Sequence, residues 1–328
     1  MTEVKIAIID SGLDDHISIP KNSIIGGHGY SLKDGRIRHT FDFSDTNGHG
    51  TAIGGIINYE TNSSKFYIIR ILNENNASNG KLMIQAIRDA LDLGVDIIHM
   101  SLGTESMEYK EELEKLVKQA HEKKILMVAA RPLEVKQCVP ADIKNVFKVF
   151  FGFIKNRQNI YWYKDEFYAQ GVPQMVIYKK NLYRLMGGSS IAAAHLTAKI
   201  ASILSKERKE KTFEEVNRNL KKECWQVKNR NIARKDIWKY DGKKYLTTNQ
   251  LEIYNEVLYC VKEVLGEKFD ESIPLWFQGI KTKAYYLLKT LEDHLKIKID
   301  YQDYNFFHFF TINNLVEKID QESQRLLR

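Results

Sequence analysis

The chain has 328 residues, of which 43% are hydrophobic and 28% are charged, and its formal net charge is +7. These values are ordinary for a globular protein of roughly two domains. They exclude a membrane-spanning class, because no stretch approaches the ~18 apolar residues that a span needs.

The N-terminus lacks the basic and apolar regions of a secretory signal. The cysteines Cys138, Cys224 and Cys260 are odd in number and far apart, which argues against a disulfide framework or a zinc cluster. We therefore expect a cytoplasmic protein without a metal or a cofactor.

Strand-like and helix-like runs alternate in the first two thirds of the chain. Apolar strands are predicted at residues 5–10, 65–72, 95–103, 125–130 and 146–153, and amphipathic helices at 82–94 and 108–124. Strands that are apolar throughout and alternate with helices indicate an α/β fold, with a parallel sheet covered on both faces. Functional sites in such sheets form at the carboxyl ends of the strands.

The last 80 residues show a different pattern. Three helical patterns, at residues 250–266, 283–296 and 312–323, are separated by loops without a clear strand, which predicts a small helical bundle. A basic segment precedes them, and we interpret it as a solvated connector because no nucleic-acid motif accompanies it. The predicted organisation is a domain at residues 1–223, a basic linker at 224–247 and a helical domain at 248–328.

Three glycine-rich segments carry groups suited to nucleophilic catalysis. Asp10 ends the first strand in IIDSG, His49 lies in TNGHGTAIGG, and Ser190 lies in GGSSIAAAH. Serine is a weak nucleophile that needs a base within hydrogen-bond reach and an acid that orients the base. A helix that starts at Ser190 would also direct free backbone N–H groups toward a developing oxyanion. Each segment alone has an ordinary explanation as a cap, a loop or a turn.

Together and in this order, the three segments resemble the signatures of the subtilisin-like serine peptidases, which are D-[ST]-G, H-G-T and G-T-S-x-A. The resemblance covers residues of about 4–222 and ends at the helical pattern TFEEVNRNLKK. It implies a subtilisin-like fold with Asp10, His49 and Ser190 as the catalytic residues. Ser189 takes the place of the family's threonine, and His195 matches a histidine that is not catalytic and is expected to be a packed or capping residue.

The segment MSLG resembles the strand with which this family pairs the substrate backbone. The resemblance implies that Ser101, Leu102 and Gly103 contact a bound peptide, which is a form of β-augmentation.

One feature of the family is missing. An asparagine that completes the oxyanion hole normally follows the strand that ends here in VAA, but residues 129–140 contain none. Arg131 and Gln137 are the candidate substitute donors, and an asparagine from elsewhere in that place, such as Asn145, would contradict the loss. Losing such a donor lowers the rate by about 10²–10³. A slow or inactive peptidase therefore stays open as an alternative.

The helical tail resembles an acyl or peptidyl carrier domain, with a generic helical bundle as the alternative. Carrier domains attach a phosphopantetheine arm to a serine in D-S-L at the start of the second helix, where this chain has Lys281-Thr282-Lys283. We therefore predict that Thr282 is unmodified. The ordinary structural reading, which is compatible with this, is that Thr282 is the N-cap of its helix.

The leading hypothesis from the sequence is a cytoplasmic serine endopeptidase that matures a ribosomal peptide by removing its leader. Its partners would be the peptide and a modification enzyme that docks on the helical tail, with no nucleic acid and no membrane. The first alternative is a pseudopeptidase that binds peptide along Ser101–Gly103 without cutting it. The second is an adaptor that works through the helical tail.

Overall fold

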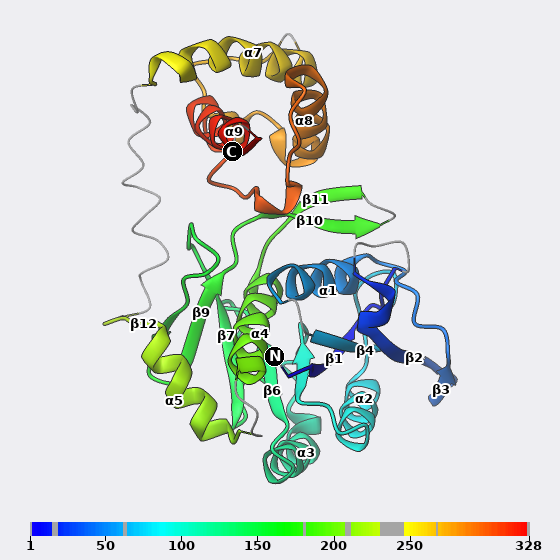
Figure 1. Ribbon diagram of the computed structural model, residues 1–328. Coiled ribbons are helices and arrows are strands. Elements are labelled where there is room, and N and C mark those ends of the chain that lie inside the picture. Colours follow the sequence, from blue (N-terminus) through cyan, green and yellow to red (C-terminus); the bar gives the residue numbers. More distant parts are fainter. Residues whose placement is uncertain are drawn as a thin grey trace. The chain divides into compact units, whose positions relative to one another are not determined.

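The computed structural model describes residues 2–14, 19–61, 64–179, 182–206, 211–229, 246–266 and 268–326. The chain forms two units (Figure 1). The first comprises Met1–Gly171, Tyr178–Asn181 and Gly187–Ala233, and the second comprises Val172–Ile177, Leu182–Met186 and Arg234–Arg328.

A ten-stranded sheet with the order β12-β8-β9-β7-β6-β5-β1-β4-β2-β3 forms the centre of the first unit. Its strands are β1 Val4–Asp10, β2 Ile24–Lys33, β3 Arg36–Thr40, β4 Ser64–Arg70, β5 Ile97–Met100, β6 Leu126–Ala130, β7 Val146–Gly152, β8 Tyr161–Tyr163, β9 Glu166–Gln170 and β12 Trp225–Gln226. The central strands from β2 to β9 through β4, β1, β5, β6 and β7 are parallel, which confirms the predicted α/β class. The pairs β2–β3 and β8–β9 are antiparallel.

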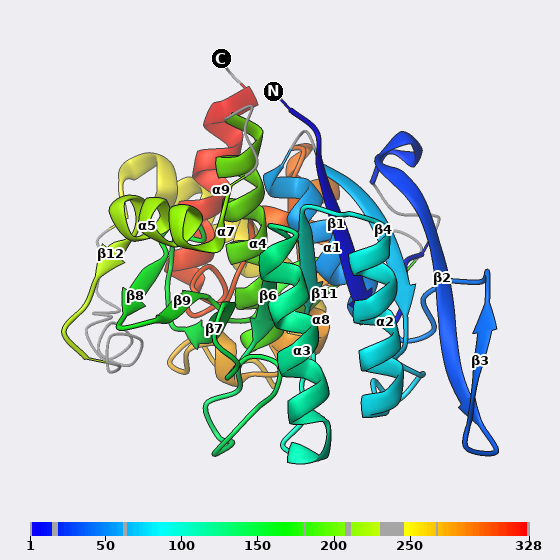
Figure 2. The ribbon, with the colours of Figure 1, turned by 90° about the horizontal axis from the view of Figure 1, so that it is seen from below.

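Helices cover both faces of this sheet (Figure 2). They are α1 His49–Glu60, α2 Gly80–Asp92, α3 Lys110–Glu122, α4 Ser189–Lys206 and α5 Phe213–Glu223, with 3₁₀ turns at Lys21–Ser23 and Met107–Tyr109. Side chains alternate along a strand, so Ala7, Ile9 and Ile98 pack with α2 and α3 in one buried cluster. The intervening positions of β1 and β5 face α1 and α4. Every residue from Ile6 to Asp10 is fully buried, as expected for a strand covered on both sides.

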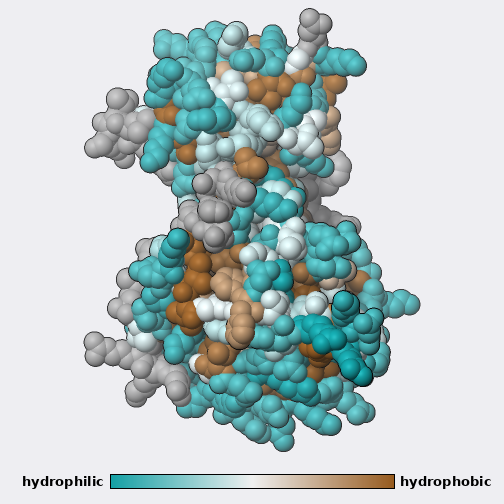
Figure 3. Space-filling view, turned by 90° about the vertical axis from the view of Figure 1, so that its right-hand side faces the viewer, coloured by the Kyte–Doolittle hydropathy of each residue, from teal (hydrophilic) through white to brown (hydrophobic). Residues whose placement is uncertain are grey.

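The antiparallel β2–β3 hairpin was not predicted from the sequence. Asp34 and Gly35 form its turn, and both have positive φ values, 51° and 71°. This Asp-Gly pair matches the preference of two-residue hairpin turns. The hairpin leaves large apolar side chains exposed, and apolar atoms are visible among hydrophilic ones on this face of the first unit (Figure 3). The exposed apolar side chains are Ile25, Leu32, Ile37 and Phe41.

The second unit contains the three predicted helices. They are α7 Thr248–Leu265, α8 Ile280–Leu295 and α9 Ile312–Leu326, with 3₁₀ turns at Leu275–Phe277 and Tyr301–Asp303. A buried apolar core joins them, formed by Val257, Val261, Leu287, Leu291, Leu315, Val316 and Ile319. The unpredicted strands β10 Gln174–Lys179 and β11 Leu182–Met186 pair with each other, and all of them except Tyr178 and Lys179 belong to this unit. Met175 donates its backbone N–H to the carbonyl of Tyr304, so the hairpin pairs with the loop before α9.

Two predictions about the ends of elements need correction. Trp225–Gln226, predicted as the start of the linker, pairs with β8 as strand β12 of the sheet. Residues 230–245 of that linker lie outside the described residues. Thr282 is not the N-cap of α8, because Gly279 takes that position in a left-handed conformation. Thr282 lies in the first turn, and its hydroxyl donates to the carbonyl of Gly279 at 3.3 Å.

Across the described ranges, no helix is long and apolar enough to cross a membrane.

Candidate active site

Two neighbouring parallel strands bring Asp10 and Ser101 together. The register pairs Ile9 of β1 with Met100 of β5, so the next residue of each strand, Asp10 or Ser101, emerges at the same carboxyl edge. This edge is where sites form in parallel α/β sheets. Asp10 is fully buried and Ser101 is nearly so.

His49 is the first residue of helix α1 and lies at the carboxyl end of β1. Its Nδ1 atom lies 2.7 Å from Oδ1 of Asp10. The same oxygen accepts the backbone N–H of Ser11 at 2.7 Å. Because a carboxylate only accepts, Nδ1 of His49 carries a proton, and in the neutral ring Nε2 then has the lone pair. That is the tautomer in which an imidazole acts as a base.

Gly50, the glycine of the H-G-T segment, permits this close approach. A Cβ atom at this position would lie 2.2 Å from the carbonyl oxygen of Gly12 and 3.2 Å from Cβ of Asp10. Any larger residue would therefore push the start of α1 away from β1 and lengthen the contact between His49 and Asp10.

Ser190 lies in the first turn of α4, which begins one residue earlier, at Ser189. The Ser190 hydroxyl donates to the carbonyl of Ser101 at 3.1 Å. At this edge Asp10 contacts His49, and Ser190 is hydrogen-bonded to Ser101, the residue that follows β5. The predicted helix start is confirmed, and the first N–H groups of such a helix are free to bind an oxyanion.

His195 is a packed residue, as expected. It is 1% exposed, and its Nδ1 atom lies 2.7 Å from Glu60 at the end of α1. The contact joins α4 to α1, so His195 serves the packing of the two helices.

Asp45 is a site residue that sequence reasoning missed. Its carboxylate accepts hydrogen bonds from the Ser11 hydroxyl, the Gly48 N–H, and both the N–H and hydroxyl of Thr51. Burial alone opposes its ionisation, but these hydrogen bonds outweigh burial and hold the pKa of Asp45 below its ordinary value. Asp45 thus ties the D-S-G turn to the start of the His49 helix. Its bond to the N–H of Asn47, an Asx turn, is the local signal that the sequence offered.

The predicted peptide-binding segment Ser101–Gly103 continues from β5 and is flanked by the loop that follows β6. Thr104 and Val139 exchange two backbone hydrogen bonds, of 2.9 and 3.0 Å. A Cβ atom on Gly103 would lie 2.5 Å from Sγ of Cys138, so this glycine is required by close packing. Leu102 packs partly against the core.

The structure contradicts the assignment of Arg131 and Gln137 as oxyanion donors. Arg131 is 7% exposed, and all three of its guanidinium nitrogens donate within the loop 132–142. Their acceptors are the carboxylate of Asp142 and the carbonyls of Pro132, Val135 and Lys136. Gln137 donates its amide N–H to the carbonyl of Glu105 at 2.9 Å. Asn145 directly precedes β7 and so lies at the opposite, amino edge of the sheet.

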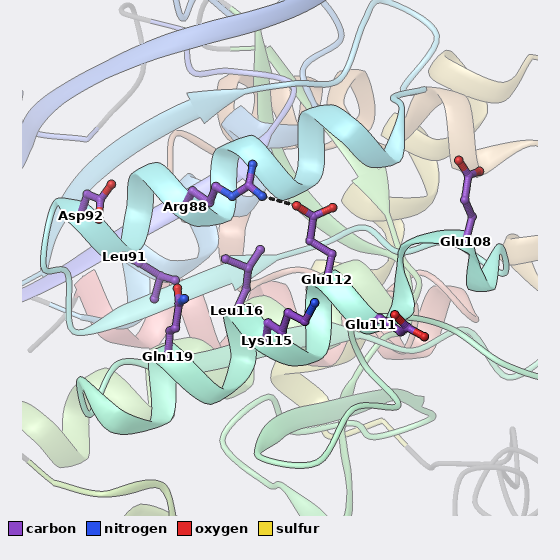
Figure 4. Close-up of a pocket in the computed structure, with 9 residues that line it drawn as sticks. All are labelled: Arg88, Leu91, Asp92, Glu108, Glu111, Glu112, Lys115, Leu116 and Gln119. Atoms are coloured by element: carbon purple, nitrogen blue, oxygen red, sulfur yellow. Dashed lines mark hydrogen bonds and ion pairs between the residues drawn. The ribbon is translucent and has the colours of Figure 1, made fainter.

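A groove of about 650 Å³ lies elsewhere, between α2 and α3 (Figure 4). An ion pair between Arg88 and Glu112 crosses it. Its lining residues are Arg88, Leu91, Asp92, Glu108, Glu111, Glu112, Lys115, Leu116 and Gln119. None of these residues belongs to the carboxyl edge that carries Asp10 and Ser101.

Comparison with known proteins shows what the first part of the chain is similar to. Residues 1–131 match the model of the subtilase family. The minor extracellular protease Epr of Bacillus subtilis (strain 168) is 28% identical over 240 residues, which cover 66% of this chain and 35% of that protein. The major intracellular serine protease of the same organism is 28% identical over 226 residues, covering 62% of this chain and 69% of that protein. The chain thus spans about a third of the first relative and about two thirds of the second.

A solved structure agrees in fold. The structure described as "Crystal Structure of a Lanthipeptide Protease" aligns with a TM-score of 0.53 and 21% identity, covering 67% of this chain and 79% of that one. The first 131 residues thus resemble the subtilase family, and both of these relatives are named as proteases.

Proposed function

We propose that this protein is a serine endopeptidase in which Ser190 is the nucleophile, His49 the base and Asp10 the residue that orients the base. The observation that carries the proposal is the 2.7 Å contact between His49 and Asp10 at the strand edge to which the Ser190 hydroxyl is bonded. The relatives named above support it.

The proposed chemistry follows from this arrangement. The Ser190 hydroxyl, which donates to the Ser101 carbonyl in this structure, gives up that bond, and Ser190 Oγ attacks the substrate carbonyl while its proton passes to Nε2 of His49. Asp10 holds the imidazole through Nδ1 and stabilises the imidazolium that forms. The oxyanion lies against the N–H groups of the first turn of α4. His49 then returns the proton to the leaving amine, and water releases the acyl group by the same steps in reverse.

A fluorophosphonate probe tests this proposal, because it labels only an activated serine. Ser190→Ala is expected to abolish labelling, and the adjacent Ser189→Ala, the matched control, is expected to keep most of it. Equal loss from both substitutions in folded protein would contradict the assignment. Absence of labelling in the unsubstituted protein would favour a peptide-binding pseudopeptidase, which the engagement of Arg131 and Gln137 also favours.

The proposed substrate is a ribosomal peptide from which a leader is removed in the cytoplasm. The likeness to a lanthipeptide protease supports the first part, and the likeness to an intracellular serine protease supports the second. Incubation with leader-bearing precursor peptides, followed by mass spectrometry, should give a single cleavage between leader and core. Cleavage at many sites of an unrelated protein such as casein would contradict a maturation role.

The proposed role of the helical unit is that of a carrier-like docking domain. The order of α7, α8 and α9, with Thr282 in the first turn of α8, supports this reading. The proposed partner is an enzyme that modifies the same peptide. Co-purification of that enzyme with the full chain, and its loss when exposed residues of α8 are exchanged, would test the docking.

A further inference from the structure

His99 is a fully buried histidine for which the proposed reaction has no use. It lies on β5 between Ile98 and Met100, on the sheet face that α4 covers, and is 0% exposed. A buried imidazole needs a hydrogen-bond partner at each nitrogen to offset its removal from water.

Both ring nitrogens of His99 have such partners. Nδ1 lies 2.7 Å from the Thr197 hydroxyl, two turns into α4. Nε2 lies 2.7 Å from the hydroxyl of Ser101. The Ser101 hydroxyl in turn donates to the carbonyl of Ser190 at 3.2 Å.

The direction of each bond follows from the supply of protons. A hydroxyl has one proton, and Ser101 must give it to the Ser190 carbonyl, which only accepts. Nε2 of His99 is therefore the donor to Ser101. Nδ1 of the neutral ring is then an acceptor, and Thr197 donates to it. The chain of bonds runs from α4 through the imidazole and Ser101 back to Ser190 at the start of the same helix.

We propose that His99 is a positioning residue that holds Ser190 in place through Ser101. The proposal rests on the role of Ser190 as the nucleophile. Ser101 is joined to Ser190 twice, since its hydroxyl donates to the Ser190 carbonyl and its carbonyl accepts the Ser190 hydroxyl. His99 restrains the side chain of Ser101 and so fixes the first turn of α4, whose N–H groups face the oxyanion.

Burial keeps the ring neutral, as the chain of bonds requires. The pKa of His99 is lowered to about 4, chiefly by desolvation; the nearby Asp10 opposes this shift and His49 adds to it. The imidazole is therefore uncharged near neutral pH, with one donor and one acceptor nitrogen.

Two substitutions test the hydrogen bonds of the two ring nitrogens of His99 separately. The amide nitrogen of His99→Gln can take the place of Nε2 and keep the bond to Ser101. The shorter side chain of His99→Asn reaches only the place of Nδ1. We expect the Asn variant to lose about 10–100-fold in kcat and in the rate of fluorophosphonate labelling at little change in KM, since small misplacements near the reacting atoms have effects of this size. The Gln variant should recover most of the loss.

A double-mutant cycle distinguishes positioning from general stability. Because His99 acts through Ser101, the losses in His99→Asn and Ser101→Ala should not multiply in the double variant. Ser205→Ala is the matched control, since Ser205 is a buried hydroxyl on α4 outside this chain of bonds and should leave the labelling rate unchanged. Multiplying losses, or equal losses in the Gln and Asn variants, would overturn the proposal.

Nuclear magnetic resonance keeps this test separate from that of the proposed function. The His99 ring should carry its proton on Nε2, and His99→Asn should shift the backbone amide signals of Ser190 and Ile191 more than His99→Gln does. These results are expected even if Ser190 proves unreactive toward the probe, in which case only the proposed function fails. A proton on Nδ1, or unshifted amides, would contradict the role of His99 itself.

Discussion

Nδ1 of His49 and Oδ1 of Asp10 lie 2.7 Å apart, although the two residues are 39 positions apart in the chain. Asp10→Asn would keep the shape of this contact but could place an amide N–H against the imidazole, which favours the wrong tautomer. We expect kcat to fall by about 10³–10⁴-fold with the fold retained. Peptide turnover and thermal unfolding measured on the same sample would test this. A loss below about tenfold would show that Asp10 does not orient His49.

Gln137→Ala should leave kcat nearly unchanged, because the amide of Gln137 donates to the carbonyl of Glu105. A side-chain oxyanion donor would instead account for about 10²–10³ in rate. Steady-state measurement of kcat therefore distinguishes the two roles of Gln137. A fall of 10² or more in kcat would restore Gln137 as the substitute donor.

Arg131→Met should act on stability. The buried guanidinium donates to the carbonyls of Pro132, Val135 and Lys136, and its removal leaves these acceptors without that donor, at a cost of about 1–3 kcal/mol. Asp142 keeps its ion pair with Lys148, so the loss should come from these carbonyls, and urea unfolding would measure it. An unchanged unfolding free energy together with a large fall in kcat would contradict the bracing role of Arg131.

Gly103→Ala tests the predicted peptide-binding segment. The added methyl group would meet Sγ of Cys138, so the segment must shift and bind peptide less tightly. We expect at least a tenfold weaker Kd for a substrate peptide on a Ser190→Ala background, since overpacking costs about 1–3 kcal/mol. Adding Cys138→Ala removes the obstruction and should restore binding. Unaltered affinity in the single variant would show that the segment does not contact the peptide backbone.

The burial of His99 also predicts a pH dependence of stability. Its pKa is about 4 in the folded protein and near 6.5 when unfolded, so between these values the unfolded chain binds the proton more readily. The neutral ring makes its full contribution to the free energy of unfolding above pH 6.5. That contribution is lost as the pH falls toward 4, and the free energy of unfolding decreases by up to about 3 kcal/mol. Unfolding free energies of the unsubstituted protein and His99→Asn should therefore differ in slope over this window. Parallel curves would contradict the lowered pKa.

Thr282 should carry no phosphopantetheine. Its branched Cβ crowds the hydroxyl, which already donates to Gly279, and Lys281 and Lys283 flank it. Intact mass after incubation with coenzyme A and a broad transferase should be unchanged. The variant with Lys281→Asp, Thr282→Ser and Lys283→Leu is the positive control, since it rebuilds the sequence that carriers use. A mass gain in the unsubstituted chain that disappears in Thr282→Ala would overturn the prediction.

The predicted strands and helices of the first unit were confirmed within a few residues because each is a long apolar or amphipathic run. The strands β2, β3, β8, β9, β10, β11 and β12 were missed. Their pairing depends more on neighbouring strands than on a hydrophobic pattern of their own, although the Asp34-Gly35 turn between β2 and β3 is a local signal. Gly279 was missed as the cap of α8 because a glycine cap relies on backbone conformation and leaves no side-chain signature.

The sequence by itself determined the α/β class, the order of the three motifs and the loss of the family's asparagine, since these depend on residue identity and local periodicity. Only the tertiary structure decided which polar groups are already engaged. Arg131 is bonded within its own loop and Gln137 to Glu105, whereas Asp45 and His99, which lie next to family motifs but are not part of them, reach the site through their side chains. Such contacts depend on strand register and on which face of the sheet a side chain occupies. Residues far apart in the chain set both, so local pattern does not reveal them.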